Sequence, residues 1–260
     1  MKLASWLFGI ASALAGLFDL IWGEFEPAHQ PIQAWSDHIP GLPILARIAA
    51  LWLILGGLAL LIRPAARIGA AALAILYAIF CFFPLPRLIT APHYLGYHPF
   101  VYIGVLIDVA QQLILFIAAL LLWLHLTEPG RFPASVTILA RILFGLCCID
   151  FAFGHFTGIP ATAAMIPHWI PFGGPFWTIF TGIAFLLAGL AIITGIFDVL
   201  AARLLSLMLL LFTLLVLAPR AFASPHNHVP WGSNAYNLTA VAAAWILSAW
   251  LSYSREQAPA

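Results

Sequence analysis

Charged residues are scarce in this sequence and make up only 7% of its 260 residues. A soluble domain usually carries roughly 25% charged residues. Here 64% of the residues are hydrophobic and the mean hydropathy is +1.06. The formal net charge of +1 offers no electrostatic attraction for nucleic acid. The composition therefore predicts an integral membrane protein that contacts the lipid bilayer and has no nucleic acid as a partner.

Cysteine is also rare, and Cys81, Cys147 and Cys148 form no C-x-x-C pair. A disulfide framework and a dithiol redox motif are therefore not indicated, and we expect small buried thiols. The sequence contains no phosphate-binding glycine loop, no dinucleotide-binding fingerprint and no G-x-S-x-G nucleophile motif. No extended soluble stretch is present that could hold such a site.

Long apolar runs dominate what remains. A membrane-spanning helix needs about 20 mostly apolar residues. Eight runs fit, at residues 4–23, 43–62, 67–83, 101–124, 136–154, 176–198, 203–218 and 235–252. We therefore predict an all-α polytopic membrane protein with eight transmembrane helices. Small residues near the membrane centre, Gly56, Gly57, Gly182 and Gly189 among them, indicate close helix packing.

Two sequence patterns occur twice. The stretches 86–93 (PRLITAPH) and 219–226 (PRAFASPH) share P-R-x-x-x-x-P-H, and 19–23 (DLIWG) matches 150–154 (DFAFG). We infer an internal duplication, with one four-helix repeat at 1–126 and another at 133–253. Because four is even, the repeats should insert in the same direction, unlike the inverted repeats of many transporters. The first run could be read as a signal peptide, but its match in the second repeat argues that it is retained.

Basic residues predict the orientation in the membrane. Most of them lie at the two termini or in the connections after the second, fourth and sixth runs: Lys2, Arg63, Arg67, Arg131, Arg141, Arg203 and Arg255. The opposite loops contain only Arg87 and Arg220. We therefore expect a bacterial inner-membrane protein with both termini in the cytoplasm. All histidines except His125 then lie on the extracytoplasmic side.

These outer histidines are candidate metal ligands, because neutral imidazole is the commonest side-chain ligand. The first repeat supplies His38, His93 and His98, the second supplies His168, His226 and His228, and Glu24 and His155 occupy equivalent positions after the repeated glycine. Such sets suit copper, zinc or iron, and a haem could instead take one histidine from each repeat. The alternative is that the histidines lie at the membrane interface or hold the loops.

Ionisable residues inside a span are expensive and are functional candidates by default. Asp19 and Asp150 are therefore candidate catalytic residues, acting as a proton relay or orienting a histidine. The alternative is an Asp–Arg clamp that holds an outer loop. Arg87 and Arg220 are candidates for binding a cofactor or another anion, such as a haem propionate, a lipid phosphate or a sulfur oxyanion, or else they cap loop carbonyls. Glu26 occurs only in the first repeat, which fits one half being catalytic.

The stretch 141–156, with Arg141, Gly145, Asp150 and Gly154 in it, resembles the opening helix of DoxX-like membrane proteins. The four-helix unit with a loop after its first helix is similar too. That superfamily includes quinone-linked thiosulfate oxidation subunits, methylamine-dehydrogenase maturation proteins and cargo receptors, so the resemblance implies a fold more than an activity. This chain departs from it by its eight helices, its outer histidines and its missing dithiol.

Several functions fit these features. The leading hypothesis is a membrane redox protein with a metal, haem or quinone site built from histidines of both repeats. The first alternative is a non-catalytic membrane subunit, or a binder of lipids or small molecules, that docks a partner through its outer loops. A lipid-modifying acid–base enzyme is another. A coupled transporter is less favoured, because the ionisable groups gather at one face of the membrane.

Overall fold

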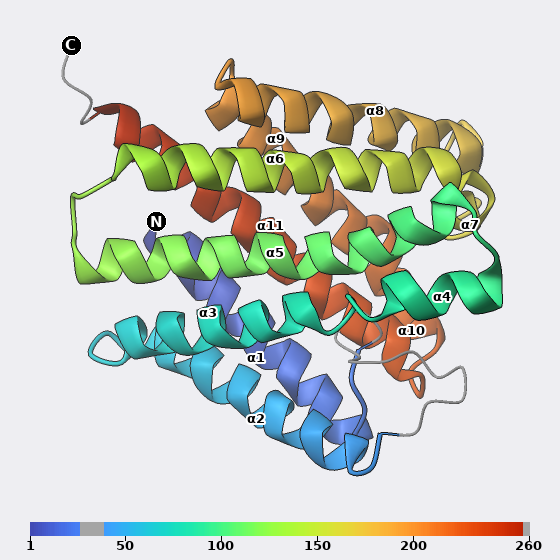
Figure 1. Cartoon of the computed structure of the whole chain (residues 1–260), viewed down its shortest axis with the longest axis horizontal. Helices are drawn as coiled ribbons and strands as arrows, with labels where there is room; N and C mark the ends of the chain where they lie inside the picture. The colour runs from blue at the N-terminus through green and yellow to red at the C-terminus, as the bar shows by residue number, and fades with distance from the viewer. Residues whose placement is uncertain (27–38, 257–260) are drawn as a thin grey trace.

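The computed structural model describes residues 1–26 and 39–256, and this part of the chain is helical without strands (Figure 1). Its helices are α1 (Lys2–Trp22), α2 (Leu42–Leu61), α3 (Ala66–Phe82), α4 (Arg87–Leu95), α5 (Pro99–Thr127), α6 (Ala134–Thr157), α7 (Ile159–Ala163), α8 (Gly173–Thr194), α9 (Asp198–Phe212), the π-helix η2 (Thr213–Leu217), α10 (Ala218–Ala223) and α11 (His228–Glu256). His38, one of the candidate metal ligands, lies outside the described residues.

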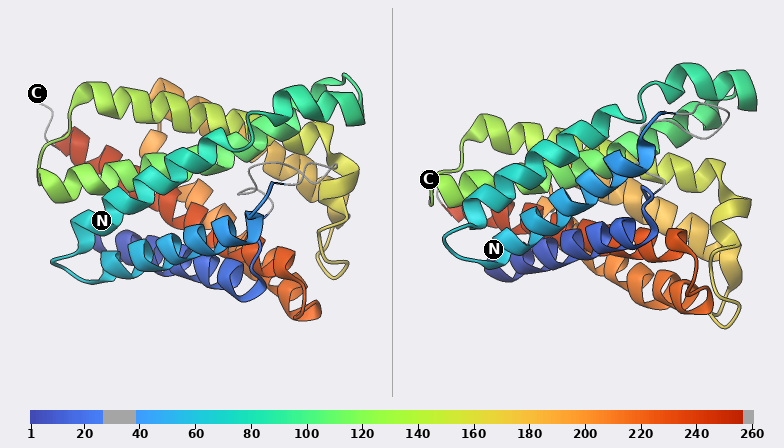
Figure 2. Two further views of the ribbon diagram at one scale, coloured as in Figure 1. Left: turned by 60° about the horizontal axis from the view of Figure 1, so that its bottom comes forward. Right: turned by 90° about the horizontal axis from the view of Figure 1, so that it is seen from below.

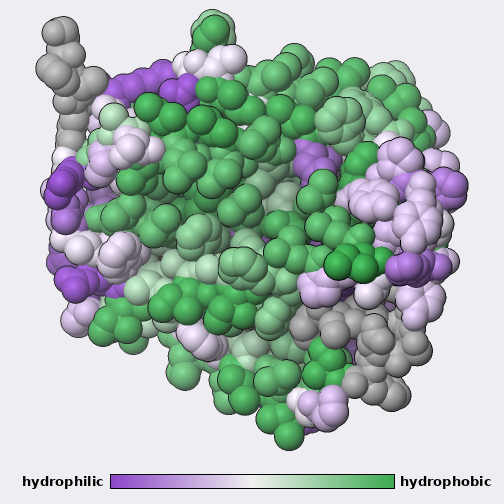
Figure 3. Space-filling view, in the orientation of Figure 1, coloured by the Kyte–Doolittle hydropathy of each residue, from purple (hydrophilic) through white to green (hydrophobic). Residues whose placement is uncertain are grey.

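The prediction of apolar helices long enough to span a membrane is confirmed. In the described ranges seven helices are long and apolar enough to cross a bilayer, and α3 with α4 makes an eighth span if this pair, bent by 41°, is counted as one. Figure 3 shows one face of the molecule, where a broad hydrophobic surface lies between two more polar ends. Helices suit this environment because they satisfy their own backbone hydrogen bonds where lipid offers no partners.

The connections between the predicted spans are partly helical, because residues 84–100 contain α4 and residues 155–175 contain α7. The last span also begins earlier than predicted, at His228 instead of residue 235. Proline explains much of the difference. Pro99, Pro160 and Pro219 lie in the first turns of α5, α7 and α10, where a missing N–H costs no helical hydrogen bond.

The helices form one bundle with a shared core. Helix α1 packs on α2, α2 on α3 and α3 on α5, while α6 packs on α8, α8 on α9 and α9 on α11. Contacts of α1 with α11, α5 with α6 and α5 with α11 join these two sets. The N-terminus and the end of α11 lie at one end of the bundle, which we call the terminal end. The short helices α4, α7 and α10 lie at the other end, which we call the far end (Figures 1 and 2).

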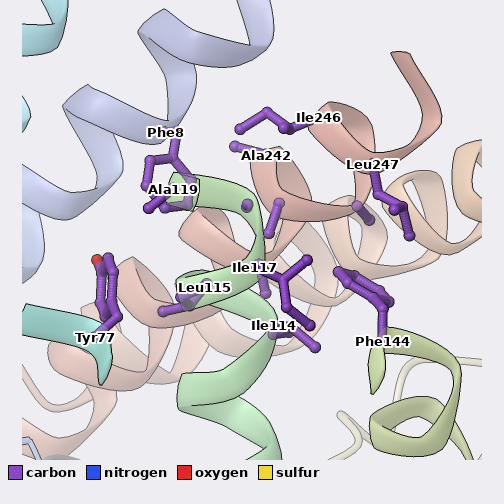
Figure 4. Packing of buried hydrophobic residues seen from close by; sticks show 14 of the residues in the cluster. Phe8, Tyr77, Ile114, Leu115, Ile117, Ala119, Phe144, Ala242, Ile246 and Leu247 are labelled. Carbon is purple, nitrogen blue, oxygen red and sulfur yellow. The ribbon is translucent and has the colours of Figure 1, made fainter. Parts of the chain in front are cut away.

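Helix α5 lies in the middle of the hydrophobic core (Figure 4). Its Leu115 and Ala119 lie toward Tyr77 of α3 and Phe8 of α1, while Ile114 and Ile117 lie toward α6 and α11. All of these side chains are at most 3% exposed. The core therefore spans both predicted halves of the chain.

At several helix contacts the backbones approach so closely that only glycine fits. A Cβ atom on Gly9 would lie 2.6 Å from the carbonyl oxygen of Gly57, across the α1–α2 contact. On α6 and α8, a Cβ atom on Gly145 would lie 2.8 Å from the carbonyl oxygen of Gly189. The predicted packing role of Gly57 and Gly189 is confirmed, because small residues let transmembrane backbones come together.

At the terminal end, Asp198 joins three helices. It accepts a hydrogen bond from the backbone N–H of Val199 at 2.6 Å, which satisfies one free donor at the start of α9. Its carboxylate forms an ion pair with Arg255 of α11 and lies 3.7 Å from the guanidinium of Arg141 of α6. The Asp198 side chain is 2% exposed, whereas the side chain of Arg255 is 53% exposed, so a buried carboxylate is paired with an arginine at the surface.

Replacing Asp198 with alanine is expected to lower the free energy of unfolding by about 2 kcal/mol, because it leaves the partly buried Arg141 without its carboxylate. Titration with SDS in mixed micelles, followed by circular dichroism, measures this. Glu128→Ala is the matched control, since Glu128 pairs with Arg131 on the exposed surface and such pairs contribute little. Equal losses in the two variants would contradict the assigned role of Asp198.

Candidate functional site

A buried Asp–His pair joins the far ends of α1 and α11. The Nε2 atom of His228 lies 3.0 Å from the Oδ1 atom of Asp19, and both side chains are at most 4% exposed. The indole ring of Trp22 stacks on the imidazole of His228, with 5.3 Å between the ring centroids. Asp19 thus orients a histidine, one of the two roles that the sequence analysis considered for it.

The first motif arginine, Arg87, is also buried, at 1% exposure. Its Nη1 atom donates to the Oδ2 atom of Asp108 at 2.6 Å, so the ion pair holds α4 against α5. The clamp expected between a motif arginine and an aspartate therefore exists, but its acid is Asp108. Arg87 thus forms an ion pair within the protein. It does not line the large apolar cavity of the bundle.

Glu26 lies near both of these pairs. Gly23 ends α1 in a left-handed conformation, and the chain then brings Glu26 to 6% exposure. The Ser233 hydroxyl donates to its Oε1 atom at 3.3 Å. A Cβ atom on Gly232 would lie 2.7 Å from the Cγ atom of Glu26. Glycine at position 232 thus leaves the space that this carboxylate occupies.

The other candidate ligands are dispersed. Two of these histidines contact a neighbouring aromatic side chain. His93 is hydrogen-bonded to the Tyr97 hydroxyl at 3.1 Å, and His98 stacks on Phe100. The exposed candidates are Glu24, His93, His98, His168 and His226. Within residues 1–26 and 39–256, no three His, Cys, Asp or Glu side chains gather in a way that could hold a metal ion. The expected three-histidine sets are not assembled by these residues.

The second copies of the repeated residues, Asp150 and Arg220, are less buried than the first copies, Asp19 and Arg87. Asp150 of α6 is half-buried, and its Oδ2 atom is shielded from solvent without a hydrogen-bond partner in the described chain. Arg220 of α10 is exposed. The buried acid–base groups gather instead on α1, α4, α5 and α11, near Glu26.

A large apolar cavity of about 980 Å³ lies between α5, α6, α8, α9 and α11. Most of its wall is Leu, Ile, Ala and Phe. Several wall residues also lie on the outer surface, such as Leu187 (60% exposed), Leu204 (56%) and Leu207 (51%). The cavity is therefore open between α8 and α9 to the lipid side of the bundle.

The polar side chains of the wall gather toward the far end. They come from the end of α6, from α7, from the start of α8 and from the start of α11, and include His155, Thr162, Trp177, Thr181, Ser233, Tyr236 and Asn237. Glu26 lies in the same wall. The cavity thus has a long apolar body and a polar head, as expected for a site that holds an amphiphile.

His155 has a defined orientation in this wall. Its Nδ1 atom lies 2.8 Å from the carbonyl oxygen of Phe151, which requires the proton on Nδ1. In the neutral imidazole, Nε2 then carries the lone pair. The ring packs against Phe185 with 5.1 Å between centroids. His155, predicted as a metal ligand, is placed as a hydrogen-bond acceptor in an apolar cavity.

A π-helix forms part of the wall where α9 ends. The wider turn at η2 lies beside Asn237, whose Nδ2 atom donates to the carbonyl oxygen of Leu209 at 2.7 Å and to the Thr213 hydroxyl at 2.8 Å. π-helical turns inside α-helices occur frequently at functional sites. Asn237 compensates for the changed backbone bonding and so fixes the shape of the cavity wall.

Sequence reasoning missed the cavity, because its wall consists of ordinary apolar residues from distant segments. The one available signal was Glu26, an acid without a counterpart in the second half. Family models, curated proteins and solved structures give no match to this chain. The functional argument therefore rests on the geometry of the site.

Proposed function

We propose that the protein binds a lipophilic molecule with an uncharged polar head group, with a quinone as the leading candidate, in the cavity between α8 and α9. The observation that carries this proposal is the amphiphilic wall, which is apolar along its length and polar only toward the far end. An isoprenoid tail fits the apolar part, and the ring fits beside Phe151, Phe185 and Trp177.

The charges in the wall favour an uncharged head group. None of the described wall residues is lysine or arginine, and Glu26 is the only acid among them. A phosphate or sulfate head would meet the Glu26 carboxylate in a described wall that contributes no lysine or arginine, whereas anion sites normally use Arg, Lys or helix N-termini. Arg87 supplies no such cation, because it does not line the cavity and already donates to Asp108.

In this proposal a quinone supplies redox chemistry, and the protein contributes binding and proton transfer. His155 Nε2 and the Glu26 carboxylate are the wall groups that accept protons. The Asp19–His228 pair lies near Glu26, since the position of a Cβ on Gly232 is 2.7 Å from the Cγ atom of Glu26 and 3.5 Å from the Nε2 atom of His228. We do not propose a metal or haem, because the described residues that were expected to bind one are dispersed.

The finer architecture belongs to the same proposal. The parallel sets of helix contacts, α1–α2–α3–α5 and α6–α8–α9–α11, support a tandem duplication of a DoxX-like four-helix unit. The basic residues support cytoplasmic termini in an inner membrane, which puts the far end, with Glu26 and His155, on the extracytoplasmic side. One half then keeps the acid–base groups, while the other forms most of the cavity.

Filling the cavity tests the proposal. Ala184 of α8 lines the wall, and Ala184→Trp is expected to weaken binding of a radiolabelled short-chain ubiquinone by at least about tenfold, which corresponds to about 1.4 kcal/mol. The measurement uses the full chain in nanodiscs, with empty nanodiscs subtracted. The control is Ala71→Trp on α3, a half-buried alanine away from this cavity. Unchanged binding in Ala184→Trp, or no specific binding by the unmodified protein, would refute the proposal.

A further inference from the structure

The hydrogen-bond donors in the cavity wall are mostly occupied by the protein itself. Four side chains with hydroxyl or amide donors line the polar head of the cavity and use them internally. These bonds run from Ser233 Oγ to Glu26 Oε1 (3.3 Å), from Tyr236 Oη to the Gln111 carbonyl (3.4 Å), from Thr181 Oγ1 to the Trp177 carbonyl (2.7 Å) and from Asn237 Nδ2 to the Leu209 carbonyl (2.7 Å).

The ring N–H groups of the wall are occupied in the same way. The indole N–H of Trp177 donates to the carbonyl oxygen of Pro171 at 2.7 Å, and His155 uses its Nδ1–H on Phe151. Apart from the weak thiol donor of Cys148, the described wall then has two side chains with uncommitted donors, the Gln111 amide and the Thr162 hydroxyl.

The wall also presents hydrogen-bond acceptors. They include the Glu26 carboxylate, which is 6% exposed, and the Nε2 lone pair of His155. Each carboxylate oxygen has two lone pairs, so it can accept a hydrogen bond from a ligand in addition to one from the protein. A ligand that donates can add hydrogen bonds to these acceptors, whereas a ligand that only accepts cannot.

We propose that the cavity selects a head group that donates hydrogen bonds, namely a hydroxyl-bearing amphiphile, and that for a quinone it prefers the reduced hydroquinone form. This inference rests on the proposed function and names the chemical form of its ligand. The two phenolic hydroxyls of a hydroquinone donate to acceptors such as Glu26 and His155. The carbonyl oxygens of the oxidised form only accept.

The test compares three ligands of nearly the same size on the full chain in nanodiscs, under anaerobic conditions. They are decylubiquinol, decylubiquinone and the dimethyl ether of decylubiquinol, which keeps the ring but cannot donate. Decylubiquinol is expected to bind at least about tenfold more tightly than either of the others. Equal affinity for the three ligands, or tighter binding of the quinone, would overturn the inference while leaving the proposed binding site intact.

The variant Glu26→Gln tests whether Glu26 causes the preference for decylubiquinol over decylubiquinone. Glutamine keeps the size of the side chain but adds two donors, so the ratio of the two affinities should fall toward one. The matched control is Glu24→Gln, because Glu24 is exposed two residues earlier and should keep the full preference. A preference that survives in Glu26→Gln would refute the role of Glu26. Failure of all three ligands to bind would remove the proposed function itself.

Discussion

Replacing Arg87 with methionine is expected to lower the free energy of unfolding by about 3 kcal/mol. The substitution leaves Asp108 inside the membrane without its cation, and breaking a buried ion pair from one side costs about 3–5 kcal/mol. We expect a loss at the lower end of this range because the Asp108 side chain is 24% exposed. Unfolding of the purified variant by SDS in mixed micelles measures the change.

The repeated motif provides the control for this experiment. Arg220→Met changes the equivalent residue of the second motif, which is exposed, and should leave the stability within about 0.5 kcal/mol. The double variant Arg87→Met with Asp108→Leu should recover part of the loss, because the uncompensated carboxylate is removed as well. Equal effects of the two arginine substitutions would show that Arg87 does not stabilise the fold through burial.

Gly57→Ala should be nearly as damaging as Arg87→Met, although it adds a single methyl group. The new Cβ atom would collide with the carbonyl oxygen of Gly9 and would lie 2.8 Å from the backbone nitrogen of Ala13. Both neighbours are backbone atoms, which cannot rotate away, so α1 and α2 must separate. Overpacking costs about 1–3 kcal/mol, and we expect the upper part of this range in the same unfolding assay.

Gly104→Ala is the control for the added methyl group. A Cβ atom on Gly104 would meet nothing within 4 Å, and alanine is the better helix former by roughly 1 kcal/mol. This variant should therefore be as stable as the unmodified protein or slightly more stable. A loss in Gly104→Ala as large as that in Gly57→Ala would mean that helix contact is not the cause.

Hydropathy predicted the long spans well because the cost of exposing polar groups to lipid acts on every residue. Hydropathy misplaced helix ends where polar residues are stabilised by contacts with helices that are distant in the sequence. The first turns of α11 contain Pro230, Gly232 and Ser233, which lie before the span predicted at 235–252. They are helical, and their polar groups pack against α1, where His228 meets Asp19 and Ser233 meets Glu26.

The site could be predicted only in part, for a similar reason. Asp19 was selected because a buried acid in a span needs a partner, but that partner lies 209 residues away in the sequence. Repetition was also an incomplete guide, since it gave Arg87 and Arg220 the same role although one is buried and the other exposed. The cavity depends on the gap between two helices, and spacing along the chain does not encode that gap.

The opening between α8 and α9 also affects how any affinity must be expressed. Leu204 and Leu207 line the cavity and are exposed, so a lipophilic ligand of the proposed kind would enter the cavity from the acyl chains. Its partition coefficient then sets the supply, and the relevant variable is the mole fraction of ligand in the membrane. Diluting the protein with more lipid at a fixed total amount of ligand lowers occupancy, whereas diluting the suspension with buffer hardly changes it.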